Sequence, residues 1–232
     1  CSVDDMRYVG EETQFVSGLP QSGKDAGGDP SPWTALGCIQ GIEAAVQARL
    51  GKDSLDGIRV AVQGVGHVGY YLCRLLHEAG AELFIADVNG DNLKMTLDAV
   101  PAMVVPPSEV LFADVDVLAP CALGNILTSS TIPNIKAKVI AGAANNQLST
   151  PADGLRLAQR DILYAPDYVI NAGGIISVAH EFYGDASEDD VRADVGRIKD
   201  RLADLFRQAA ETGRPTNELA DELARKLVAE AR

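Results

Sequence analysis

Residues 58–89 read IRVAVQGVGHVGYYLCRLLHEAGAELFIADVN, and this stretch decides the fold. Ile58–Val62 is a short apolar run rich in β-branched residues, which predicts a buried parallel strand. Gly64–Gly69 follows with the spacing GxGxxG, and the residues after it predict a helix that ends at Gly80. Glu82–Ala86 is the second predicted strand. The order strand, glycines, helix, strand is the context in which this glycine pattern carries meaning.

Each glycine of this pattern has a separate physical role. Gly64 permits a tight turn, Gly66 lets the backbone approach a pyrophosphate, and Gly69 lets the helix pack close to the strand. The helix N-terminus adds unpaired N–H groups and positive potential. The sequence therefore predicts a dinucleotide-binding turn. The alternative, a glycine-rich turn in an unrelated α/β protein, is disfavoured by the order of the elements.

Asp87 ends the second predicted strand, 18 residues after Gly69. A carboxylate at this place accepts hydrogen bonds from both adenosine ribose hydroxyls and repels a 2′-phosphate. Residues 86–91 contain no Arg or Lys that would accommodate such a phosphate. We therefore predict NAD rather than NADP as the cofactor. The alternative is that Asp87 only caps the next helix.

The rest of the chain continues the alternation of strands and helices. Four more strands are predicted at Met103–Val105, Val115–Ala119, Val139–Ala141 and Ile162–Tyr164. Helices are predicted at Pro32–Leu50, at Asp91–Val100, from Thr150-Pro151, from Asn171, at Ser187–Ala210 and at Glu218–Ala229. Ser31 is the expected N-cap of the first. In the last, Leu219, Leu223 and Leu227 should be buried. Residues 6–17 are assigned no element, and residues 18–32 are read as a loop.

This pattern predicts an α/β protein of the Rossmann type, a doubly wound and mostly parallel sheet with C-terminal helices that pack back across the cleft. We expect residues 1–50 to form a bridging segment and helix, residues 51–170 the NAD-binding domain, and residues 171–232 a helical segment that completes the cleft.

Composition excludes several classes of function. The net charge of −13 repels phosphate backbones, so nucleic acid is not an expected partner. No apolar run reaches the ~18 residues that a membrane span needs. The four cysteines, at positions 1, 38, 73 and 121, lack metal-ligand spacing, so no metal site is expected. Mostly buried free thiols indicate a reducing compartment, and we expect a cytoplasmic protein.

Three further motifs follow predicted strands, where loops line the cofactor crevice of such a sheet. Cys121 could be a nucleophile, although a small packing residue beside the cofactor is favoured. The asparagines of residues 143–146 suit a ribose, a carboxamide or a carboxylate, or simply form a turn. The glycines of residues 171–174 admit a ligand or form a plain turn. His180 and Glu181 are expected to have surface roles.

Several longer motifs together resemble the superfamily of glutamate, leucine, phenylalanine and valine dehydrogenases. They are Asp5-Met6, Glu11-Glu12-Thr13, Pro30-Ser31-Pro32 with Thr34, Val62–Gly66, Ala119–Gly124, Ala143–Leu148 and Tyr164–Gly174. The resemblance covers nearly the whole chain, and its leucine and phenylalanine branch, with phenylalanine dehydrogenases nearest, fits better than the glutamate branch. It implies NAD-dependent oxidative deamination of an L-amino acid, with phenylalanine expected before leucine or valine, to a 2-oxo acid and ammonia.

The resemblance also assigns roles to individual residues. Ser31 and Thr34 should border the nicotinamide, and Asp87 and Val88 should meet the adenosine. The pyrophosphate should be held by Gly64, Val65, Gly66, His67, Val68, Gly69 and Tyr70, and the loops lining the cofactor should contribute Cys121, Ala122, Ala143, Ala144 and Asn145. Substrate contacts are expected from Asn145, Asn171, Ile175 and Val178.

The catalytic lysines and aspartate of the family have no counterpart in this sequence, and the resemblance places them upstream of Cys1. The expected partners are therefore an N-terminal domain of the same enzyme, the amino-acid or 2-oxo-acid substrate, and further copies in a homo-oligomer. Alone, the chain should bind NAD without turnover. A non-catalytic NAD-sensing module is the alternative from another class of function.

Overall fold

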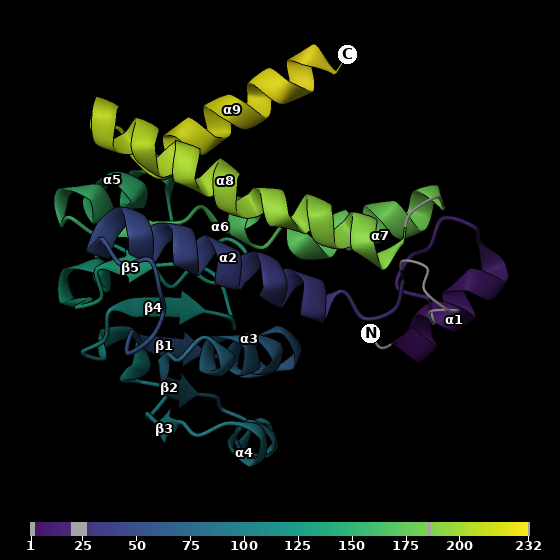
Figure 1. The fold of residues 1–232 in the computed structure, drawn as a ribbon, viewed down its shortest axis with the longest axis horizontal. Helices are drawn as coiled ribbons and strands as arrows, with labels where there is room; N and C mark the ends of the chain where they lie inside the picture. The colour runs from purple at the N-terminus through teal and green to yellow at the C-terminus, as the bar shows by residue number, and fades with distance from the viewer. Residues whose placement is uncertain (1–2, 20–26, 185–186, 232) are drawn as a thin grey trace.

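The computed structural model describes residues 3–19, 27–184 and 187–231. Its centre is a sheet of parallel strands in the order β3-β2-β1-β4-β5-β6 (Figure 1). The strands are β1 (Arg59–Gln63), β2 (Glu82–Ala86), β3 (Met103–Val104), β4 (Val117–Pro120), β5 (Val139–Ile140) and β6 (Leu163–Tyr164). This order confirms the predicted Rossmann-type sheet, because the chain reverses direction across the sheet between β1 and β4.

Helices and short 3₁₀ turns connect the strands and flank the sheet. The helices are α1 (Val3–Glu12), α2 (Ser31–Leu50), α3 (His67–Glu78), α4 (Gly90–Ala99), α5 (Pro151–Gln159), α6 (Asp167–Ile170), α7 (Gly173–Tyr183), α8 (Glu188–Thr212) and α9 (Thr216–Glu230). The 3₁₀ turns cover Val110–Phe112 and Ile132–Asn134. No helix in these described ranges is both long and apolar enough to cross a membrane.

The sheet buries a separate apolar core on each face. Val60 and Val62 of β1 belong to the core shared with α2, α3 and α8, whereas Ala61 belongs to the core on the opposite face. This alternation follows from the two-residue period of a strand. The continuous apolar run of β1 is therefore explained, since both faces of the strand are covered.

Helices α7 and α8 pack against α2, as Figure 1 shows for α8, whereas α9 packs against α8 and α5. The face of α8 toward α2 is apolar, with Val195, Ile198 and Leu202 all buried. Gly41 allows this close packing, because a Cβ there would lie 2.7 Å from Cδ1 of Leu202. Ser187 caps α8 in a reciprocal capping box with Asp190.

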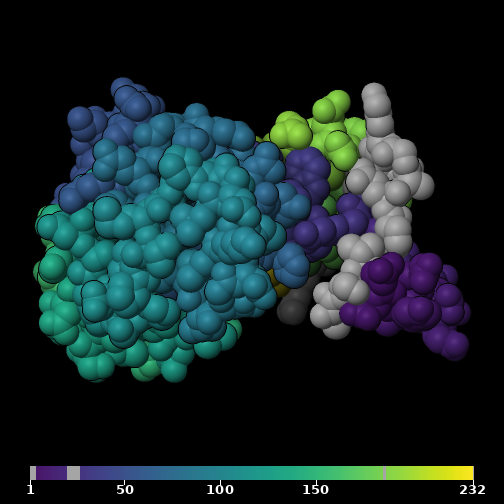
Figure 2. Space-filling model, turned by 90° about the horizontal axis from the view of Figure 1, so that it is seen from below, coloured from purple at the N-terminus to yellow at the C-terminus, as the bar shows by residue number. Residues whose placement is uncertain are grey.

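Three local predictions are wrong. Residues 6–17 were assigned no element, yet α1 begins at Val3 and lies at one end of the molecule, away from the sheet (Figure 2). Ser31 is not the N-cap of α2 but its first helical residue, and Pro30 occupies the cap position without a side-chain hydrogen bond. Leu227 of α9 is 46% exposed, so only the first part of that helix is buried against its neighbours.

Element boundaries differ from the sequence expectation by a few residues elsewhere. The helix after the glycine motif begins already at His67, and α9 begins at Thr216 rather than Glu218. The short helix α6 was not expected before Asn171. Part of the loop predicted over residues 18–32, namely 20–26, lies outside the described residues.

Candidate cofactor-binding site

The glycine turn joins β1 to α3 at the carboxyl end of the sheet. Gly64 has φ of 90°, and its N–H donates to the Ala86 carbonyl oxygen at 2.7 Å. A Cβ on Gly69 would lie 2.0 Å from the Gly64 carbonyl oxygen, so this glycine is required for packing. A Cβ on Gly66, in contrast, would meet no atom within 4 Å. Open space therefore lies at the glycine that should face a pyrophosphate.

The first turn of α3 borders this open space. Gly66 is the N-cap, and no side chain caps the helix. The first backbone N–H groups of a helix have no intrahelical partner, so they attract an anion. His67 is exposed, Val68 and Tyr70 are half-buried, and Val65 is buried. The turn thus fits a diphosphate through its backbone N–H groups.

Asp87 stands directly beside the glycine turn. Its Oδ2 accepts the Val65 N–H at 2.8 Å and lies 3.3 Å from Nδ2 of Asn92, and its Oδ1 accepts the Asn89 N–H at 2.8 Å. A carboxylate has about four acceptor sites, and three are used here, so about one remains for a ribose hydroxyl. The sequence predicted neither the bond that links Asp87 to the turn nor the contribution of Asn92. Val88 is 93% exposed, as a residue facing an adenine ring would be.

The loops after β4 and β5 meet on the other half of the sheet. A Cβ on Gly124 would lie 2.1 Å from the Asn145 carbonyl oxygen, and the Asn125 N–H donates to the Asn146 carbonyl oxygen at 2.6 Å. Ala122 and Leu123 are exposed, and Leu123 reaches 78%. These loops present an apolar surface next to asparagine side chains.

The chemistry of Cys121 favours packing over nucleophilic attack. Burial raises the pKa of its thiol to about 11, although a hydrogen bond with the Ala143 backbone opposes the shift. Burial also raises the pKa of Cys38 and Cys73 well above the usual range. A thiol with a raised pKa carries little thiolate at neutral pH, and the thiolate is the nucleophile. No group of three or more metal-ligating side chains occurs within residues 3–19, 27–184 and 187–231.

Asn145 and Asn171, both predicted from the sequence to contact substrate, come together from separate segments. Nδ2 of Asn171 donates to Oδ1 of Asn145 at 2.6 Å and to the Ala143 carbonyl oxygen at 3.1 Å. Asn145 is exposed, and Ala144 is buried below it. The pair therefore presents amide groups at the carboxyl end of β5.

The N-termini of α2 and α7 cross closely beside this pair. A Cβ on Gly173 would lie 2.1 Å from the Trp33 carbonyl oxygen, and one on Gly174 would lie 2.4 Å from Oγ1 of Thr34. Packing between helices therefore explains these two glycines. The sequence suggested either ligand access or a plain turn for them, and not this packing role. Thr34 donates its hydroxyl to the Pro30 carbonyl oxygen at 3.1 Å.

The predicted residues around this crossing differ in exposure. Ser31 is buried, so its side chain offers little surface to a nicotinamide. Ile175 is 66% exposed and Val178 is half-buried. Of these two candidate pocket residues, Ile175 has the more accessible side chain.

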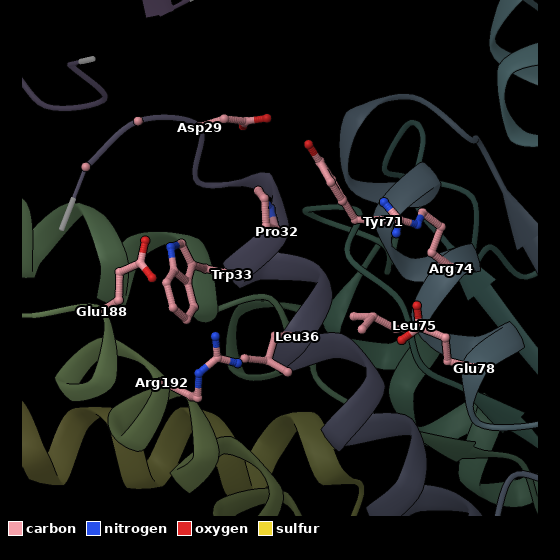
Figure 3. Close-up of a pocket in the computed structure, with 12 residues that line it drawn as sticks. Asp29, Pro32, Trp33, Leu36, Tyr71, Arg74, Leu75, Glu78, Glu188 and Arg192 are labelled. Carbon is pink, nitrogen blue, oxygen red and sulfur yellow. The ribbon is translucent and has the colours of Figure 1, made fainter. Parts of the chain in front are cut away.

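A cavity of 510 Å³ lies outside this arrangement, among α2, α3 and the start of α8 (Figure 3). In Figure 3, Tyr71 of α3 points toward Pro32 of α2. The Trp33 ring lies on the other side of the cavity, where the Arg192 guanidinium is 5.3 Å from its centre. The charged residues that line the cavity are of both signs: Asp29, Arg74, Glu78, Glu188 and Arg192. This mixture selects no class of ligand, so the candidate site is the loop surface at the strand ends.

The fold and this loop surface define a dinucleotide-binding domain of the dehydrogenase type. The model of the glutamate/leucine/phenylalanine/valine dehydrogenase family matches residues 29–91 and 88–232. The chain therefore belongs to this family, and the predicted resemblance is confirmed. Amino-acid dehydrogenases of the family are NAD(P)-dependent, which confirms a nicotinamide dinucleotide as the cofactor.

Curated relatives carry several substrate names. The chain is 43% identical to a leucine dehydrogenase of Geobacillus stearothermophilus, over 98% of this chain and 61% of the relative. It is 46% identical to an L-tryptophan dehydrogenase of Nostoc punctiforme, over 95% and 62%. A phenylalanine dehydrogenase of Bacillus thermotolerans is 38% identical, over 98% and 60%. The chain thus spans about three fifths of the length of these relatives.

Two solved structures of amino-acid dehydrogenases are also similar to this chain. The crystal structure of L-tryptophan dehydrogenase from Nostoc punctiforme has a TM-score of 0.85 at 44% identity, covering 98% of this chain and 64% of the other. The hetero-hexameric glutamate dehydrogenase of Thermus thermophilus has a TM-score of 0.76 at 25% identity, covering 97% and 58%.

Proposed function

We propose that this chain is the cofactor-binding part of an NAD-dependent L-amino-acid dehydrogenase. The reaction is the oxidative deamination of an apolar L-amino acid to its 2-oxo acid and ammonia. One observation carries the proposal: the open glycine turn with Asp87 occupies one half of the sheet edge, and the Asn145–Asn171 pair occupies the other. A dinucleotide lying across that edge would contact both.

Different residues of the chain would bind different parts of the cofactor. The amides of residues 64–69 hold the pyrophosphate, and Asp87 holds the adenosine ribose and disfavours a 2′-phosphate. Asn145 holds the nicotinamide ribose and, with Asn171, orients the substrate. Bound NAD supplies the hydride acceptor for the reaction. Cys121 and Ala122 shape the apolar wall beside it.

Several features of the whole enzyme are part of the proposal. Residues 51–170 act as the NAD domain, residues 171–232 complete its cleft, and residues 1–50 bridge to a substrate domain that carries the catalytic lysines and aspartate. The substrate is phenylalanine, leucine or tryptophan; phenylalanine was favoured by sequence, while relatives named for the other two are more similar. The enzyme is a homo-oligomer; the hetero-hexameric glutamate dehydrogenase of Thermus thermophilus supports assembly into an oligomer, although its own subunits differ.

A chimera tests this proposal. The N-terminal portion of the Geobacillus stearothermophilus leucine dehydrogenase that lies outside the matched region is joined in front of this chain. NADH formation is then measured with NAD⁺ and each of the three amino acids. We expect turnover with at least one of them, and none from the unjoined 232-residue chain. A folded chimera that binds NADH without turnover would support the non-catalytic module instead.

A further inference from the structure

One fully buried side chain closes the loop that carries Asn145. Nε2 of Gln147 donates to the carbonyl oxygens of Gly142 and Ala144, each at 2.9 Å. These two carbonyls lie on either side of Ala143, which itself accepts from Asn171. The glutamine therefore fixes the backbone from which Asn145 projects.

The backbone of Gln147 links this loop to the next segment. Its N–H donates to Oδ2 of Asp167 at 2.9 Å, and Oδ1 of Asp167 accepts the Tyr168 N–H at 2.7 Å. Asp167 begins α6, which leads directly to Asn171. Because Asn171 bonds back to Asn145, the contacts form a closed ring of loop, helix and loop.

The glutamine is retained at a cost in stability. Its Oε1 is buried without a hydrogen-bond partner among the described residues. An unsatisfied buried acceptor destabilises the folded state, because it loses its hydrogen bonds to water. Violations of this kind concentrate at functional sites, where position matters more than stability. In return, the two hydrogen bonds from Nε2 of Gln147 fix the backbone at Gly142 and Ala144.

From this ring we infer that Gln147 and Asp167 are positioning residues for the nicotinamide half of the cofactor. The inference rests on the proposed function. The β4–β6 half of a Rossmann sheet holds the nicotinamide nucleotide, and the β1–β3 half holds the adenosine. Among the described residues, the hydrogen-bond partners of Gln147 and Asp167 all lie in the β4–β6 half. The two residues therefore act on NADH through Asn145 and Asn171 and leave the adenosine half unchanged.

Two probes separate these halves, namely NADH and ADP, which lacks the nicotinamide nucleotide. Dissociation constants for both are measured by titration calorimetry on the 232-residue chain and on Gln147→Leu, Asp167→Ala and Asp167→Asn. We expect NADH to bind the first two variants at least fivefold more weakly, while ADP binding stays within twofold. Asp167→Asn keeps one acceptor oxygen and should lose less.

Gln40→Leu is the matched control, since Gln40 on α2 also has a buried Oε1 without a partner in the described ranges but lies outside the ring. It should leave the NADH-to-ADP ratio unchanged. Should Gln147→Leu fail to fold, Asp167→Ala gives the same readout. An equal loss of NADH and ADP, or no loss of either, overturns the inference. If the unchanged chain binds NADH no better than ADP, only the inference fails; if it binds neither, the proposed function fails with it.

Discussion

At the level of single residues, two glycines of the turn are needed for different reasons. Gly69 is needed because its neighbour's backbone occupies the space of a Cβ, whereas Gly66 faces space that the chain leaves open. The sequence pattern treats the three glycines alike. The structure shows that one protects packing and one leaves room for a ligand.

Gly66→Ala should therefore impair mainly NADH binding, whereas Gly69→Ala should impair mainly stability. Gly66→Ala should weaken NADH binding at least tenfold, because the new methyl group fills the pyrophosphate space, and shift the Tm little. Gly69→Ala should lower stability by about 1–3 kcal/mol through overpacking against the Gly64 carbonyl. Fluorescence titration with NADH and thermal unfolding check both. Similar Tm losses in the two variants would contradict the distinction.

At the scale of elements, Arg59 and Asp116 join the start of β1 to the segment before β4. The Arg59 N–H donates to Oδ2 of Asp116 at 2.9 Å, and Nη2 of Arg59 lies 3.3 Å from Oδ1. Burial alone would raise the pKa of Asp116, but the hydrogen bonds and charge of Arg59 outweigh it and hold the pKa below its usual value. The carboxylate therefore stabilises the fold in its charged form.

The pH dependence of this contribution has a definite sign. A folded-state pKa below the unfolded value gives stability that is present above about pH 4 and is lost as the pH falls through the folded pKa. Asp116→Asn should lower the Tm at neutral pH and flatten its fall on the acid side. Asp98→Asn, at an exposed position on α4, is the control. An acid limb of unchanged steepness in Asp116→Asn would refute this assignment.

Glu181 of α7 is a second link between elements. Its carboxylate accepts the Gly18 N–H at 2.7 Å and the Leu19 N–H at 2.9 Å, which ties the segment after α1 to α7. The aromatic rings of Phe15 and Phe182 stack beside it, with centres 6.5 Å apart. The sequence predicted only a surface role for Glu181, because a partner 163 residues away leaves no local signal.

Glu181→Ala should loosen this segment without disturbing the sheet. Loss of two charge-assisted bonds should raise amide hydrogen exchange at Gly18 and Leu19 about tenfold or more. The amides of β1 should keep their protection. Glu211→Ala, which removes only an exposed ion pair with Arg207, should leave all of these rates unchanged. Unchanged exchange at Gly18 and Leu19 in Glu181→Ala would show that the carboxylate does not hold the segment.

At the scale of the whole molecule, the sequence predicted what local patterns determine. Strand β1, the glycine turn and Asp87 lie within 30 residues, so their order alone defined the sheet type and the cofactor. The ring through Gln147 and Asp167 was not predicted, since it depends on loops brought together only by the parallel order of β4, β5 and β6. Helix α1 was missed because it has few apolar residues and most of its described residues are exposed, so no core contact marks it in the sequence.

The central claim is that one edge of this sheet binds NAD through backbone amides and the Asp87 carboxylate. Titration of the 232-residue chain with NADH and with NADPH tests it most directly. We expect saturable, one-to-one binding of NADH and binding of NADPH at least tenfold weaker, because the carboxylate repels a 2′-phosphate. Equal or tighter binding of NADPH, or no saturable binding of NADH, would contradict it.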